Sequence, residues 1–135
     1  MAYGRRNIIS GGIAIFVATA GGMALGFTLE AYFPRGFYEM PLTRALMKAG
    51  HTHGMPFALY NLIYGSLIDR MALDDLWKKR GSLLAMFAFI MPVGLVLRGI
   101  DSGAMTFAPV VMTGALCFLA SAAVLIKGAV TQKKA

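Results

Sequence analysis

Long runs of uncharged, mainly apolar residues alternate along the chain with short segments that carry the charges. A helix needs about 20 mainly apolar residues to cross ~30 Å of hydrocarbon. Residues 8–29 form one such run and residues 102–126 another. Residues 81–98, with Arg98 at their end, lie near the lower length limit. A further run, 49–68, reaches a spanning length only if its helix includes both histidines of the chain.

These runs predict an all-α protein, an integral membrane bundle of four transmembrane helices within a single domain, 1–135. Isolated strands would leave backbone groups unpaired in lipid, and the runs are too long and continuous for a small barrel. The predicted spans are 8–29, 49–68, 81–98 and 102–126, with an outer loop at 30–48 and an inner loop at 69–80.

The composition agrees with a membrane protein rather than a water-soluble one. Hydrophobic residues make up 58% of the chain and charged residues 14%, whereas a soluble domain carries about 25% charged residues. The net charge of +7 does not indicate nucleic-acid binding, because the basic residues lie at the ends of the apolar runs, where membrane topology explains them. We therefore expect the lipid bilayer as a partner and no nucleic acid.

The distribution of Lys and Arg predicts the orientation, because cytoplasmic loops are enriched in them. With four spans, the N-terminus, the middle loop and the C-terminus share one side and hold nine of the 13 basic residues. The other side holds four: Arg35, Arg44, Lys48 and Arg98. We therefore expect both termini in the cytoplasm and a multi-pass protein of the bacterial cytoplasmic (inner) membrane.

The inner loop predicts a short interfacial helix over 71–80. Asp74 or Asp75 is a suitable N-cap for it, because a carboxylate oxygen accepts from the free N–H groups of a first turn. Trp77 suits an anchor at headgroup level, and the three basic residues 78–80 favour an anionic leaflet.

The outer side predicts two further local structures. Pro41 suits the first turn of a helix over 42–48, which either lies on the membrane or leads into the second span. Asp101 or Ser102 is expected to cap the fourth helix, with Arg98 close enough to pair with Asp101.

Small residues in the first span predict close helix packing. Gly22 and Gly26 are one turn apart and would let a second helix backbone approach. The partner is either another helix of this chain or a helix of another subunit.

The two histidines form the one constellation with ligand chemistry, within the segment His51-Thr52-His53-Gly54-Met55-Pro56. Residues two apart on a helix point about 200° apart, so a regular helix sends the rings to different sides. If Gly54 and Pro56 unwind the backbone, both rings can reach one small ion, with Met55 as a soft third ligand.

A stripe of aromatic and polar residues continues inward from His53. Phe57, Tyr60 and Tyr64 share its face, and Asn61 lies nearby. Polar side chains in membrane helices usually face the bundle interior. The stripe is therefore interpreted as the lining of a haem, quinone-like or lipid-headgroup site with His53 as the interior ligand, or as interhelical hydrogen bonding alone.

Residues 49–65, AGHTHGMPFALYNLIYG, resemble the HxHG helix of small bacterial four-helix membrane proteins, which look like fragments of the haem–copper oxidase catalytic subunit. The resemblance implies haem b or copper as candidate ligands. No other predicted span carries a histidine, so the opposing ligands of an oxidase core are missing. This departure leaves at most one axial or ancillary site.

Three functions follow as expectations. The first is a small accessory or structural subunit of a larger membrane complex, respiratory or metal-dependent and oxidising, or a homo-oligomer. The alternative is a metal- or haem-binding protein that uses His51, His53 and Met55. A carrier or channel is the third, although no charge lies at mid-membrane. The sequence shows no nucleophile–base pair or paired carboxylates, so we expect no enzyme activity by the chain alone.

Overall fold

The computed structural model describes residues 3–32 and 41–132, and within these ranges every regular element is helical. The prediction of an all-α protein is confirmed to that extent. The elements are α1 (Tyr3–Tyr32), α3 (Pro41–Ile68), α4 (Asp75–Phe87), α5 (Ile90–Ile100), the 3-10 helix η1 (Met105–Phe107) and α6 (Ala108–Thr131).

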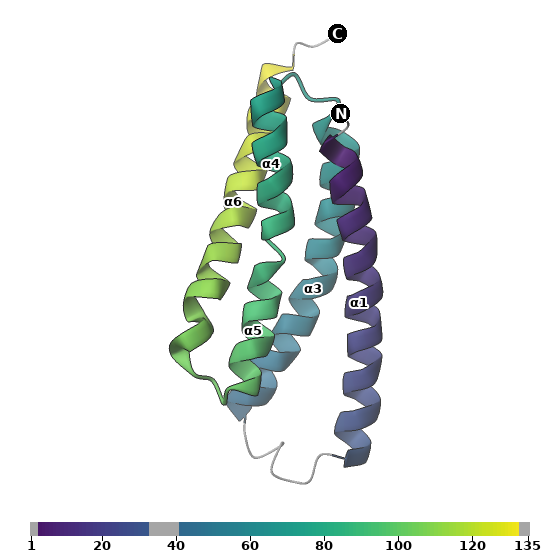
Figure 1. The fold of residues 1–135 in the computed structure, drawn as a ribbon, viewed down its shortest axis with the longest axis vertical. Coiled ribbons are helices and arrows are strands. Elements are labelled where there is room, and N and C mark those ends of the chain that lie inside the picture. Colours follow the sequence, from purple (N-terminus) through teal and green to yellow (C-terminus); the bar gives the residue numbers. More distant parts are fainter. Residues whose placement is uncertain (1–2, 33–40, 133–135) are drawn as a thin grey trace.

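The helices run up and down along one long axis, with both chain termini at the same end (Figure 1). We call this the termini end and the opposite end the loop end. α1 packs mainly on α3, α3 packs on α5, and α6 packs along both α4 and α5. At the loop end α5 lies between α3 and α6 (Figure 1).

Two helical stretches of the described chain are long and apolar enough to cross a membrane. These are Asp75–Ile100, which comprises α4 and α5, and Met105–Thr131, which comprises η1 and α6. The other two predicted spans lie within α1 and α3, which are 30 and 28 residues long.

α3 is one continuous helix from Pro41 to Ile68. The helix predicted over 42–48 therefore leads directly into the predicted second span. Residues 30–32 and 41–48 of the predicted outer loop 30–48 are helical, so that loop was predicted too long, and residues 33–40 lie outside the described ranges. The helix continues through Gly54 and Pro56, so the predicted alternative of an unwound histidine segment is wrong.

The helix after the inner turn begins at Asp75, and Asp74 is its N-cap. The carboxylate of Asp74 accepts a hydrogen bond from the backbone N–H of Trp77 at 2.8 Å, as predicted. The prediction of a separate interfacial helix over 71–80 is wrong. The helix that begins at Asp75 continues past residue 80 to Phe87, and it forms the first part of the membrane-length stretch Asp75–Ile100. The Lys127 ammonium lies 3.6 Å from the centre of the Trp77 ring, which joins α6 to this turn.

A break at Ala88–Phe89 separates α4 from α5. Pro92 has no backbone N–H, so it cannot donate to the carbonyl of Ala88 one turn earlier. That carbonyl accepts from the backbone N–H of Met91 instead, at 3.1 Å. The proline thus bends the membrane-length stretch Asp75–Ile100 near its middle (Figure 1).

The connection from α5 to α6 differs from the prediction. The fourth helix begins at η1 and Ala108, so neither Asp101 nor Ser102 caps it. Ser102 has a positive φ of 49° inside the turn. The Arg98 guanidinium donates to the carbonyls of Gly103 and Ala104, both at 3.2 Å, in place of the predicted pair with Asp101.

Close contacts between small residues join α1 to α3, and we call them the α1–α3 seam. Gly4 meets Gly65, Gly11 meets Ala58, Ala18 meets Gly54, and Gly22 meets the ring of His51. At Gly4, Gly11 and Gly22 a side chain would collide with α3. Gly4, Gly11 and Ala18 are seven residues apart, the spacing that keeps one face on a neighbouring helix.

Of the predicted pair of packing glycines, one contacts another helix of this chain. Gly22 belongs to the α1–α3 seam, and it packs within the chain. Gly26 has no described atom within 4 Å of the position where a side chain would begin. The two residues are 40° apart on the helix, and the crossing with α3 takes in only one of them.

A carboxylate from the turn after α3 closes the start of α1. Asp69 accepts hydrogen bonds from the backbone N–H groups of Tyr3 and Gly4, at 3.0 and 3.1 Å. These donors lie in the first turn of α1, where the helix itself offers no acceptor. The end of the first helix is thus held by a residue more than sixty positions later.

Candidate functional site

The two histidines lie on different sides of α3. His53 is exposed, and its Nδ1 lies 2.7 Å from the carbonyl oxygen of Ala49 in the same helix. His51 is half-buried, and its ring lies against Gly22 of α1. The prediction that His53 is the interior residue is therefore wrong, and His51 takes that position.

The reason lies in the small residues of α3. His51, Gly54, Ala58 and Gly65 follow one another at three-, four- and seven-residue steps, and all four face α1. This pattern was readable in the sequence and identifies His51 as the inward residue. The aromatic stripe favoured His53 as the interior histidine. The buried part of that stripe begins at Phe57, however, and does not include His53.

The aromatic part of the predicted stripe packs against α6. The Phe118 ring lies 4.9 Å from Phe57 and 4.8 Å from Tyr60, measured between centroids. The Tyr60 hydroxyl lies 2.8 Å from the hydroxyl of Ser121. Tyr64 is fully buried, and its hydroxyl has no hydrogen-bond partner among the described residues. Phe57 and Tyr60 thus contact α6.

Unlike the aromatic residues of the stripe, Asn61 belongs to a buried polar cluster with Asn7 and Ser82. The Asn7 amide donates to the Asn61 carbonyl oxygen at 2.8 Å, and the Asn61 amide donates to the backbone of Ala85 at 2.8 Å. The Ser82 hydroxyl donates to the Asn7 side chain. The three side chains are at most 1% exposed, and they link α1, α3 and α4.

Asn7 and Ser82 were not among the predicted site residues. The available signal was their position: each is an uncharged polar residue just inside the basic end of an apolar run. Such residues are well placed to bond across helices, since lipid offers no alternative partner.

The donor atoms of the described residues do not form a metal centre. No group of three His, Cys, Asp or Glu side chains gathers anywhere in 3–32 and 41–132. His53 lies on a different side of α3 from His51. Met55 is half-buried on the same helix. Copper held by His51, His53 and Met55 together is therefore not supported by this geometry.

Haem fits the donor set no better. The candidate partner for His51 is Met47, which lies one turn away on the same helix. Axial ligands approach the iron from opposite faces of the ring, whereas residues on adjacent turns of one helix lie on the same side. His51 and Met47 therefore cannot complete a six-coordinate haem site.

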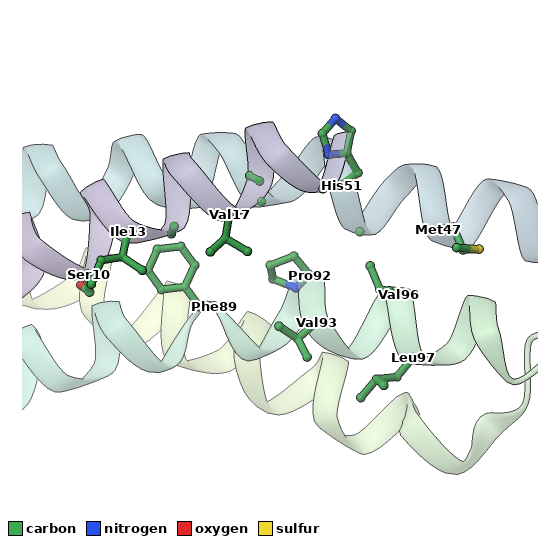
Figure 2. A pocket seen from close by; sticks show the side chains of 15 residues that line it. Ser10, Ile13, Val17, Met47, His51, Phe89, Pro92, Val93, Val96 and Leu97 are labelled. Atoms are coloured by element: carbon green, nitrogen blue, oxygen red, sulfur yellow. The ribbon is translucent and has the colours of Figure 1, made fainter. Parts of the chain in front are cut away.

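His51 and Met47 instead contribute to the wall of a cleft of about 670 Å³ between α1, α3 and α5 (Figure 2). The bend at Pro92 lets α5 follow α3 rather than α1, and α1 and α5 lie apart over this stretch. The wall is apolar apart from Ser10 and His51. Ile13 and Val17 of α1 face Phe89 and Pro92 of the bent helix across it (Figure 2).

None of the known protein-family models, curated proteins or solved structures matches this chain. The cleft and the polar cluster are therefore interpreted from their own chemistry.

Proposed function

We propose that the protein is a non-catalytic four-helix subunit embedded in a membrane. The observation that carries the proposal is an inverted polarity. The buried side chains include Asn7, Asn61, Ser82 and Ser121, while large apolar side chains are exposed along all four helical rods, among them Phe16, Ile63, Val93 and Leu119. A water-soluble bundle has the opposite arrangement, whereas lipid accepts apolar surface and favours polar contacts between helices.

The positions of the charges support four spans. The charged side chains of the described chain lie near the two ends of the bundle, and the intervening stretch carries none. The termini end has Arg5, Arg6, Asp69, Arg70, Asp74, Asp75, Lys78, Lys79, Arg80 and Lys127, and the loop end has Arg44, Lys48, Arg98 and Asp101.

The length between these two charged levels suits a bilayer. On α3 the uncharged stretch from Ala49 to Ile68 rises about 30 Å at 1.5 Å per residue. This equals the ~30 Å thickness of bilayer hydrocarbon. α3 carries the histidines and Asn61 and is not among the stretches apolar enough to span a membrane by composition. This suits a helix that packs on α1, α5 and α4.

The larger share of basic residues at the termini end favours the orientation with both termini in the cytoplasm of a bacterial cell. A cysteine-free variant, Cys117→Ala, tests this when single cysteines are added at Ser102 and at Ala72. An impermeant thiol reagent added to intact cells should label Ser102→Cys and leave Ala72→Cys unlabelled. Labelling of Ala72→Cys alone would reverse the orientation, and labelling of both would contradict the four-span topology.

The subunit role is supported by the incomplete surroundings of α1. Within the described structure this helix contacts α3 and, at the termini end, α4. Its outer face exposes Ile9 and Phe16 beside Gly12. The mass of the complex extracted with mild detergent tests the role. A mass above one chain, from a second copy or from other membrane subunits, is expected, and a single chain throughout would contradict it.

A further inference from the structure

The cleft between α1, α3 and α5 has the dimensions of one hydrocarbon chain in one leaflet. Its lining on α1 extends from Ser10 to Gly21, about 17 Å at the helical rise of 1.5 Å per residue. Half of the bilayer hydrocarbon is about 15 Å thick. A groove of that length suits an extended chain better than a compact ring system.

The cleft reaches the boundary of the membrane at the loop end. Met47 and Leu97 line it there, and their neighbours in the sequence are Lys48 and Arg98, the charged residues of that boundary. Towards the termini end the lining stops at Ser10 and Phe89, short of the basic residues Arg6 and Arg80. The cleft is therefore continuous with one headgroup layer only, and a lipid tail would enter from the loop end.

Two basic residues of the described chain, Lys48 and Arg98, adjoin this entrance. Lys48 is exposed, and in the sequence it lies between Met47 and His51, on the turn of α3 that lines the cleft. Arg98 is committed to the turn before η1, since its guanidinium donates to Gly103 and Ala104. Lys48 is thus the cation of the entrance that is placed to meet an anionic headgroup.

We propose that this cleft binds one acyl chain of an anionic phospholipid, whose phosphate lies at Lys48. The inference rests on the proposed membrane location, since it is the bilayer that supplies the lipid. Apolar walls with nothing between them would lose dispersion contacts on both sides, and an acyl chain restores these contacts without requiring a hydrogen bond. A lysine near an anionic membrane surface gains about 1 kcal/mol. A zwitterionic headgroup has the same phosphate, but its own ammonium group offsets the negative charge, so Lys48 favours the anionic lipid.

The experiment uses the full chain reconstituted in vesicles of phosphatidylcholine and phosphatidylglycerol, extracted in mild detergent and measured by native mass spectrometry. We expect retained phosphatidylglycerol on the unmodified protein. Ala14→Phe, which adds a ring to the cleft wall on α1, should abolish it. Ala20→Phe, on an exposed part of the same helix outside the cleft, should not. Val93→Phe repeats the test from α5 in case Ala14→Phe fails to fold.

Lys48→Gln tests the headgroup separately from the tail. It should lower the preference for phosphatidylglycerol over phosphatidylcholine about fivefold, which corresponds to the ~1 kcal/mol of one surface lysine. Unchanged retention of phosphatidylglycerol in both Ala14→Phe and Val93→Phe would overturn the inference. So would a retained molecule without phosphate, or an equal preference for phosphatidylglycerol in Lys48→Gln and the unmodified protein. If the protein is instead released from vesicles by alkaline carbonate, the proposed membrane location itself fails.

Discussion

α1 packs closely against α3 but lies apart from α5. Both pairs of helices belong to one bundle and both have apolar surfaces. α1 meets α3 through glycine and alanine, and the termini end adds the hydrogen bonds of Asn7 and Asn61. Between α1 and α5 the facing residues are Ile13, Val17 and Pro92, and the helices stay apart.

If the protein lies in the membrane as proposed, this difference illustrates what holds helices together in lipid. Apolar side chains gain nothing from leaving a hydrocarbon solvent, so they do not draw helices together. Close approach of backbones and hydrogen bonds between side chains do so, and both are concentrated between α1 and α3. Where they are absent, the bend at Pro92 opens a cleft rather than a core.

The largest effect should come from filling the α1–α3 seam. We expect Gly11→Leu to destabilise the fold by about 3 kcal/mol, because the new side chain would collide with the backbone carbonyl of Ala58, and overpacked positions cost up to ~3 kcal/mol. Gly12→Leu is the matched control, since Gly12 faces open space. Unfolding in mixed detergent micelles, followed by circular dichroism, measures both. Equal stability of the two variants would contradict the seam.

A smaller effect should come from the polar cluster. Asn61→Ala removes two donated bonds and leaves the Asn7 amide without one of its acceptors, so we expect a loss of about 1.5 kcal/mol. Ser66→Ala is the control, because the Ser66 hydroxyl is exposed and bonds within its own helix. A double-mutant cycle with Asn7→Ala should show coupling, and strictly additive losses would mean that the two amides act independently.

The smallest effect should separate two neighbouring tyrosines. Tyr60→Phe loses the contact with the Ser121 hydroxyl and should cost about 0.6 kcal/mol, the average for such bonds between membrane helices. Tyr64→Phe removes a buried hydroxyl without a described partner, so it should be neutral or stabilising. A greater loss from Tyr64→Phe than from Tyr60→Phe would indicate a partner for Tyr64 in the membrane that the bundle itself does not supply.

The sequence was sufficient for the helical architecture and for the Asp74 cap, because both depend on local signals. It was not sufficient for the choice between faces. Five glycines of the first span offer more than one small stripe, and the stripe that meets α3 is the one whose spacing matches Ala58 and Gly65. The same match turns His51 inward and leaves His53 outside.

The cleft could not be predicted from the sequence, although the proline that bends the helix could be identified there. Pro92 was readable as a break in a membrane helix. The consequence depends on the neighbour that the bent segment follows, and α5 follows α3 because Gly50 and Gly99 admit the backbones closely there. Local patterns identify such contact residues but do not pair them.

The bond from Asp69 to the start of α1 has a consequence for biosynthesis. The amides of Tyr3 and Gly4 leave the ribosome long before their acceptor does, since Asp69 follows the whole of α3. The leading turn of α1 therefore lacks these acceptors until α3 has been made and its far end lies beside the start of α1. In the proposed membrane location, α1 and α3 would be completed together as a hairpin rather than helix by helix.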